Sequence, residues 1–468
     1  MKQNISRRTL LQILGVAGGV SILRHVASDM RLAHAEVPNS NLLLVAYMSG
    51  GWDQLLALDP RDNTDPRFQD AAARRAGGSG ICPAYDIVSD TDVKAVLASN
   101  ATGVQKAGNL TFGPAVPQSL MAHYADLAIC RGVSMDTLTH EVGRRYLLTG
   151  KFPRGLAASG SAMTTLVASA AGGTTLLPNL AVSTESYNEG MPSFATATTV
   201  RGAADLQTVL RPLGTPLDPA SGAALEAFQA ASDTCAVHEF DQQRKMTILR
   251  ELTQKSHLVA KSSASSLFQF NLTNPSPDVA PLFSAMGIQN ATDLASARGR
   301  AAIAAQALAR GVSTAVSVEL ADDLDDHFDW DVDHATKLRT GLDALGRLIA
   351  YLKSQPHRDG GSVWSRTTLL VFSEFSRTPL LNSRAGRDHH LSGSVLLAGP
   401  KIRGNQVIGA SSDKQTAAQP IDMATGLVDQ KGAKLRPSDI HATLLTSMGM
   451  SLKPIQNQNP SLIAPLLK

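Results

Sequence analysis

The chain has 468 residues, 43% of them hydrophobic, which is enough to bury a sizeable core as one large domain or two. It contains 43 basic and 40 acidic residues, a formal charge of +3. The first 35 residues carry five basic residues and one acidic residue, so the remainder has a formal charge of about −1. The composition therefore gives no reason to expect nucleic acid or an anionic membrane as a partner.

The N-terminus has the pattern of an export signal. A twin-arginine pair, Arg7 and Arg8, precedes an apolar run over residues 10–23, which is shorter than the ~20 residues of a membrane-spanning helix. Ala33-His34-Ala35 then offers a small-x-small cleavage site. We predict a twin-arginine signal peptide over 1–35, cleaved near Ala35-Glu36 and recognised by the twin-arginine translocase. The alternative is a basic amphipathic helix that begins the domain. The expected mature protein is periplasmic or secreted.

Short apolar runs, with a segment of helically spaced leucines between two of them, indicate the fold class. Strands are expected at 41–47, 127–130, 316–320, 367–372 and 394–398, and a helix at 335–352. This alternation favours an α/β fold, a mostly parallel sheet flanked by helices. Residues 36–468 are expected to form a single domain with a mostly helical insertion at about 200–300. No second apolar run is long enough to span a membrane.

Polar residues capable of metal binding follow several of these strands. In open α/β sheets, ligands collect at the carboxyl ends of strands. Gly50-Gly51 and then Asp53 follow the first strand; here a helix-capping aspartate is the alternative. Glu374 and Arg377 follow the 367–372 strand as a candidate ligand and oxyanion clamp, or as a simple ion pair.

Two further places offer carboxylate next to imidazole. Asp325 and His327 stand in an acidic run with D-x-H spacing, which lets both reach one cation from an extended loop. A solvated acidic loop is the alternative. Asp388 and His389 precede the 394–398 strand and are ligands of the type that bind Zn²⁺, Mn²⁺ or Fe. A structural histidine is the alternative there.

Taken together, these motifs resemble the DUF1501 family, exported bacterial proteins regarded as related to sulfatases and alkaline phosphatases. The resemblance covers nearly the whole mature chain, and S-E-F-S-R-T-P at residues 373–379 is its most specific element. It implies an alkaline-phosphatase/sulfatase-like fold with one or two divalent metal ions, and Zn, Mn, Ca and Fe all remain open as their identity. The ligands it implies are Asp53, Asp325, His327, Glu374, Asp388 and His389.

One motif departs from the sulfatase pattern. His140 occupies the position of the sulfatase nucleophile, although Arg144 and the Leu-Thr-Gly ending of the motif match. Formylglycine cannot form at a histidine. Thr139 is a possible alkoxide nucleophile, and His140 is either a third imidazole ligand or a general acid. Arg144 or Arg377 would hold the anion.

Two functions follow from these expectations. The first is an exported metal-dependent hydrolase of phosphate or sulfate esters, with a small anionic ester as substrate. The alternative is a non-catalytic envelope binding or assembly protein that keeps the sulfatase-like fold. A redox enzyme is disfavoured, because the sequence has no C-x-x-C-H motif, no cysteine cluster and no G-x-G-x-x-G after a strand.

Overall fold

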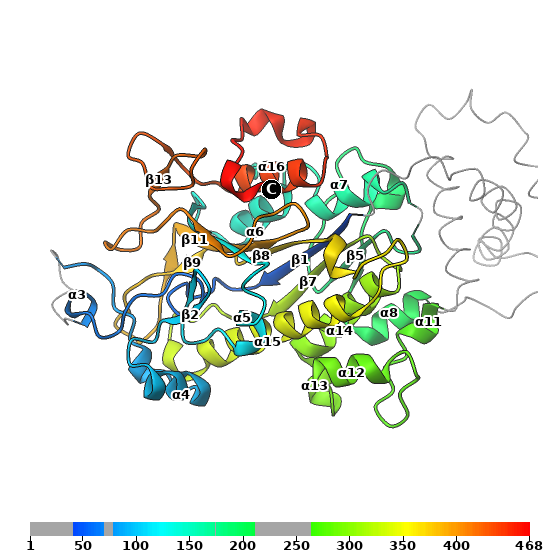
Figure 1. The fold of residues 1–468 in the computed structure, drawn as a ribbon, viewed down its shortest axis with the longest axis horizontal. Helices are drawn as coiled ribbons and strands as arrows, with labels where there is room; N and C mark the ends of the chain where they lie inside the picture. Colours follow the sequence, from blue (N-terminus) through cyan, green and yellow to red (C-terminus); the bar gives the residue numbers. More distant parts are fainter. Residues whose placement is uncertain (1–40, 70–77, 174, 211–263) are drawn as a thin grey trace, which may run out of the picture.

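The computed structural model describes residues 41–69, 78–173, 175–210 and 264–468 (Figure 1). The predicted signal peptide over 1–35 and the middle of the predicted insertion, 211–263, lie outside these ranges. None of the helices in the described ranges combines the length and the apolar character that crossing a membrane requires.

An eight-stranded sheet forms the centre of the molecule, in the order β12-β4-β11-β8-β1-β7-β5-β6. Seven strands share one direction, and β11 alone runs antiparallel to both its neighbours. The strands are β1 (Leu42–Met48), β4 (Ala128–Ser134), β5 (Asn179–Val182), β6 (Thr198–Val200), β7 (Ala315–Ala321), β8 (Thr367–Phe372), β11 (Ser392–Ala398) and β12 (Gln406–Ile408). The prediction of an α/β fold with a mostly parallel sheet is confirmed.

The five predicted strands are confirmed as β1, β4, β7, β8 and β11. All seven residues of β1 are buried, since helices cover both faces of the sheet, and this produces the continuous apolar run in the sequence. The strands β5, β6 and β12 were not predicted. They have only three or four residues each, too few to give a recognisable pattern.

Helices lie on both faces of the sheet (Figure 1). On one face α14 (Ala297–Ala309) and α15 (Trp330–Ser354) pack against β7. The predicted helix at 335–352 is confirmed as part of α15. On the other face lie α6 (His140–Thr149), α7 (Met163–Ala170) and α16 (Pro437–Ser447). Residues of β1 alternate between the two cores, with Leu44 on the α15 side and Val45 on the α16 side.

The described flanks of the predicted insertion are helical. They comprise α8 (Ala203–Leu210), α11 (Ala264–Leu267), α12 (Ala280–Met286), α13 (Ala291–Ala295) and α14. Ala301 to Leu308 of α14 contribute many buried side chains to the same core as the central sheet. This part of the 200–300 region is therefore built into the main body.

The direction of β11 determines where the polar loops meet. Because β11 is antiparallel to β4 and β8, its amino end lies at the same edge as their carboxyl ends. The residues just before Ser392 therefore lie beside the residues that follow Ser134 and Phe372. This edge holds the candidate site.

Candidate metal centre

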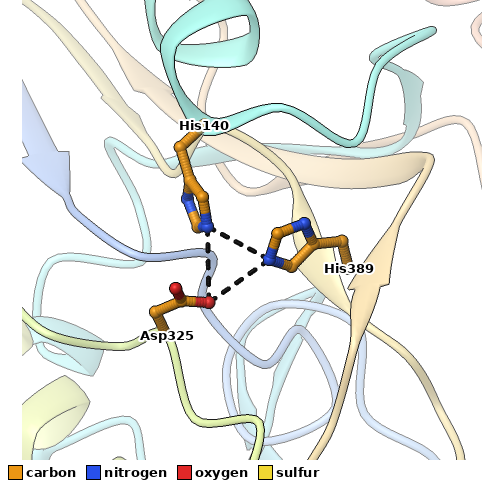
Figure 2. Close-up of side chains that lie close together, drawn as sticks. All are labelled: His140, Asp325 and His389. Carbon is orange, nitrogen blue, oxygen red and sulfur yellow. Dashed lines mark hydrogen bonds and ion pairs between the residues drawn. The ribbon is translucent and has the colours of Figure 1, made fainter.

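Three loops at this edge deliver imidazole and carboxylate groups to one point (Figure 2). His140 is the first residue of α6, after β4. Asp325 and His327 lie between β7 and α15. His389 begins the short strand β10 (His389–His390), which pairs with β9 (Ser376–Arg377) after β8.

The core of the group is a triangle of three atoms from His140, Asp325 and His389. The Nε2 atoms of the two histidines are 3.1 Å apart, and Asp325 Oδ1 lies 3.3 Å from the first and 3.2 Å from the second. Two ligands of a tetrahedral ion with bonds of ~2.0 Å are separated by roughly 3.3 Å. The triangle therefore has the dimensions of one face of such a site.

His327 reaches two of the same atoms. Its Nε2 lies 3.0 Å from His389 Nε2 and 3.1 Å from Asp325 Oδ1. The Asp325–His389 edge is thus shared by two triangles, one closed by His140 and the other by His327. Three imidazoles and one carboxylate surround this edge.

The far nitrogen of each ring fixes which ring atom carries the proton. His140 Nδ1 lies 2.7 Å from Glu374 Oε1, and His327 Nδ1 lies 2.8 Å from Asp388 Oδ1. His389 Nδ1 lies 2.6 Å from the Leu138 carbonyl oxygen. Since a carboxylate and a carbonyl only accept, each Nδ1 donates, and each neutral ring presents a bare Nε2. Three lone pairs and a carboxylate oxygen then converge, which is unfavourable unless a proton or a metal ion lies among them.

Asp325 is held in its charged form by Arg377. The Arg377 guanidinium donates a 2.5 Å hydrogen bond to Asp325 Oδ1, and it also bonds the carbonyl oxygens of Gly50 and Gly51. Burial acts to raise the pKa of Asp325, but this bond and the charge of Arg377 lower it to about 2. Arg377 is itself buried, and its guanidinium donates to Asp325 and to backbone carbonyl oxygens, so it orients Asp325.

Glu374 and Asp388 contact the imidazoles, not the convergence point. Glu374 is 1% exposed and accepts from His140 and from the backbone N–H of Gly50. Burial acts to raise its pKa, but the hydrogen bond from His140 holds it below its ordinary value. The hydrogen bond from His327 lowers the pKa of Asp388. Carboxylates in this arrangement orient metal-binding histidines and raise their basicity.

Burial and the surrounding charges shift the pKa values of the two imidazoles of the triangle in opposite directions. Burial lowers the pKa of His140, but its hydrogen bond to Glu374 outweighs this and raises the pKa above the ordinary value. Burial lowers the pKa of His389. A neutral ring is the form that binds a metal, and His389 keeps that form to lower pH.

Asp53 lies in a different network. Its side chain is buried and forms an ion pair of 3.0 Å with the buried Arg387, while its backbone N–H donates to His334 Nε2 at 3.0 Å. His334 Nδ1 in turn donates to Asp326 Oδ2 at 2.6 Å. The structure does not bring Asp53 to the Asp325–His389 edge, because its carboxylate is occupied by Arg387.

Thr139 and Arg144 flank the group without joining it. Thr139 is exposed and is the N-cap residue of α6. Arg144 lies one turn beyond His140 and bonds Glu185 at 2.8 and 3.1 Å. It lines an open pocket of about 610 Å³ at the same edge of the sheet.

Sequence reasoning missed the main-chain groups that complete this arrangement. The Leu138 carbonyl and the Gly50 N–H carry no side-chain signal. Gly50 has φ 108°, and a Cβ there would lie 2.5 Å from the backbone nitrogen of Leu324. Only glycine allows this close approach, so the Gly-Gly pair was the one sequence signal available.

Three solved structures resemble this fold at low identity. The alkaline phosphatase from the Antarctic bacterium TAB5 is 10% identical, with 88% of this chain and 99% of that chain covered. BT4656, solved with its substrate D-glucosamine-2-N,6-O-disulfate, is 10% identical, with 92% and 83% covered. Phosphonate monoester hydrolase SpPMH from Silicibacter pomeroyi is 14% identical, with 88% and 74% covered. All three TM-scores are 0.31, so the likeness assigns no residue and no activity.

The sequence has one family match and no curated relative. No curated protein is significantly similar to the chain. The family model described as "Protein of unknown function (DUF1501)" matches residues 40–458, nearly the whole chain. The chain belongs to the DUF1501 family.

Proposed function

We propose that the protein is an exported metal-dependent hydrolase of phosphate or sulfate esters. One observation carries the proposal: Nε2 of His140, Nε2 of His389 and Oδ1 of Asp325 converge within 3.3 Å, with the ring protons held on the far nitrogens. A divalent cation is the group that satisfies such a set of donors. An imidazole-rich set favours Zn²⁺, Mn²⁺ or Fe over Ca²⁺, which takes oxygen ligands.

Each residue of the centre has a distinct task in this proposal. His140, Asp325 and His389 hold the ion, and His327 supplies a further imidazole on the shared edge. Glu374 and Asp388 keep the Nδ1 protons in place, and Arg377 keeps Asp325 charged and oriented. The ion would supply a Lewis acid for an ester oxygen. The exposed Thr139 hydroxyl would be the adjacent side-chain nucleophile, and Arg144, which lines the neighbouring pocket, would hold the anion.

Metal analysis with an activity assay tests the proposal. Purified protein should contain a divalent transition metal and hydrolyse an aryl phosphate or an aryl sulfate, and His140→Ala should lose both properties. His357→Ala is the matched control, since His357 lies outside the group and its ring faces Asp359. Protein without bound metal would refute the proposal. Bound metal without turnover of either ester would support the alternative, a non-catalytic envelope protein.

The export part of the proposal rests on residues 1–35, which the structure does not describe. We propose twin-arginine export with cleavage near Ala35-Glu36. Replacing Arg7 and Arg8 together with lysine should leave uncleaved protein in the cytoplasm, as cell fractionation with immunoblotting would show. Cleaved protein outside the cytoplasm in this double variant would contradict the route.

A further inference from the structure

An open pocket lies beside the metal centre. It lies at the carboxyl ends of β1, β5, β6 and β7, next to the edge that carries the metal centre. Tyr47 in its wall pairs in register with Glu319 on one side and with Phe372, two residues before Glu374, on the other. Arg144 in its wall is one helical turn from His140. These connections place the pocket beside the metal centre.

The charges that line the pocket are balanced. Arg144, Arg201 and Arg300 face Glu185, Glu319 and Asp322. Arg144 is already paired with Glu185 at 2.8 Å, and Arg300 lies 3.6 Å from Asp322 while donating to the Glu319 carbonyl at 2.7 Å. A second anionic group would approach three carboxyl groups, and a cationic group would approach three guanidinium groups. The lining therefore favours a part of the substrate that carries no net charge.

The same lining excludes large apolar groups. Among its residues Val200 is the single aliphatic side chain, and the rest carry hydroxyl, guanidinium or carboxyl groups. An acyl chain or an unsubstituted aromatic ring would leave these groups without partners, which costs free energy. A sugar hydroxyl both donates and accepts, so it can bond to guanidinium and carboxyl groups in turn.

Tyr47 gives an independent indication that a ligand binds here. Its side chain is 2% exposed and lines the pocket, and its hydroxyl lies beside Ser49 and Arg144 without a well-aligned hydrogen bond to either of them. Burial holds its pKa well above the ordinary value, so the phenol stays protonated and can donate. Buried hydroxyls without a partner are uncommon in folded proteins, and a ligand hydroxyl would supply the partner.

We propose that this pocket binds the sugar portion of a sugar phosphate or sugar sulfate whose ester lies at the metal centre. The inference rests on the proposed function and adds the substrate class to it. The volume of about 610 Å³ lies within the range of small-molecule sites and accommodates at least one sugar ring. Glu319 strengthens the match: burial raises its pKa to about 7, so its carboxyl group both donates and accepts near neutral pH.

Two esters with the same scissile group and different leaving groups test the inference. The metal-loaded mature protein should show a higher kcat/KM for glucose 6-phosphate, or for glucose 6-sulfate, than for the phenyl ester of the same acid. Thr199→Trp fills the pocket from an exposed position of β6 and should lower kcat/KM for the sugar ester at least tenfold. It should change kcat/KM for the phenyl ester less than threefold. Tyr47→Phe should lower the sugar-ester value about fivefold, the effect of one hydrogen bond.

A matched control and a binding measurement separate this inference from the proposed function. Thr208→Trp places the same indole on the exposed face of α8 outside the pocket, and it should leave both kcat/KM values unchanged. An equal loss for sugar and phenyl esters in Thr199→Trp would overturn the inference while leaving the hydrolase proposal intact.

If neither ester is hydrolysed, the proposed function fails, and saturation-transfer NMR with methyl α-D-glucoside then tests the pocket without chemistry. Signal transfer in the wild type that disappears in Thr199→Trp and persists in Thr208→Trp would support sugar binding. Absence of transfer in the wild type would overturn it.

Discussion

Two clusters of histidine, aspartate and arginine lie near one another at the same edge of the sheet, and they differ in one respect. In the first, His334 donates from Nδ1 to Asp326 and accepts at Nε2 from the Asp53 N–H, while Asp53 pairs with Arg387. In the second, His140 and His389 also donate from Nδ1, but their Nε2 atoms face each other and Asp325.

In the first cluster each ring nitrogen and each charged group has a partner of opposite character, and in the second the ring nitrogens face one another. His334 and Arg387 are fully buried, whereas the His140 side chain is 24% exposed and that of Asp325 44% exposed. The same residue types thus form a buried structural network in one place, and in the other a candidate metal site where lone pairs meet one another and remain open to solvent. The two clusters contain similar numbers of carboxylates and imidazoles. What distinguishes the structural network from the candidate metal site is which ring nitrogens have a hydrogen-bond donor facing them.

The buried network gives the largest expected effect. Asp53→Ala leaves Arg387 buried without its counter-charge, so the free energy of unfolding should fall by about 3–5 kcal/mol. Metal content should not change, since Asp53 contacts none of the converging atoms. Denaturant unfolding and metal analysis of the same preparation measure both quantities.

The control for that experiment is Asp413→Ala, which removes a half-exposed carboxylate shared by Arg61 and Arg67 and should change stability by less than about 1 kcal/mol. If Asp53→Ala instead lost the metal at unchanged stability, Asp53 would be a ligand, as the family resemblance implied.

The open cluster gives the next effect. His389 belongs to both triangles, so His389→Ala should weaken metal binding about a thousandfold, roughly 4 kcal/mol, with little loss of stability in the metal-free protein. A competition titration with a chromophoric chelator measures the affinity. His357→Ala, the control used above, should bind as the wild type does. Wild-type affinity in His389→Ala would show that the convergence of Nε2 atoms does not hold an ion.

A third histidine extends the comparison through pH. His441 is fully buried, and its Nε2 donates to the Leu147 carbonyl at 2.7 Å, but it has no carboxylate partner. Burial lowers its pKa to about 4. Its contribution to stability should be complete above the unfolded pKa of 6.5 and lost as pH falls towards 4, because the unfolded chain then binds the proton more tightly. The loss should be on the order of 3 kcal/mol.

Denaturant unfolding of the metal-free protein between pH 4 and 8 measures this dependence. His441→Gln should show a shallower fall in stability across the same window, because it lacks the titrating group. Equal slopes in the two proteins would remove His441 as the cause.

The smallest expected effect concerns the carboxylates that orient the rings. Glu374→Gln keeps the shape of the side chain but weakens its hold on His140, so metal affinity should fall roughly 10- to 100-fold. Glu141→Gln serves as the control. Glu141 directly follows His140 in α6, and its replacement should leave the affinity unchanged. A loss as large as that of His389→Ala would make Glu374 a direct ligand.

Much of the fold could be predicted because strands buried on both faces appear as continuous apolar runs. The reversed direction of β11 could not be predicted, since an apolar run in the sequence does not show which way the strand runs in the sheet. That reversal explains why Asp388 and His389, which precede a strand, lie beside Glu374, which follows one.

The residue types of the candidate site were predictable, but only some of their contacts were. Asp325, His327 and His389 were expected as ligands and His140 as a ligand or general acid, and these four side chains converge. Asp53 and Arg377 have buried partners that lie hundreds of positions away or on main-chain atoms. No local spacing carries that information.

The place of β11 inside the sheet has a consequence for assembly. This strand inserts between β4 and β8, and the ring of His389 is attached three residues before it. A chain synthesised only as far as residue 388 would lack that imidazole and would leave two sheet strands without their neighbour. His389 can therefore bind an ion together with His140 and Asp325 only after β11 has paired with β4 and β8. An ion bound there would stabilise the completed sheet.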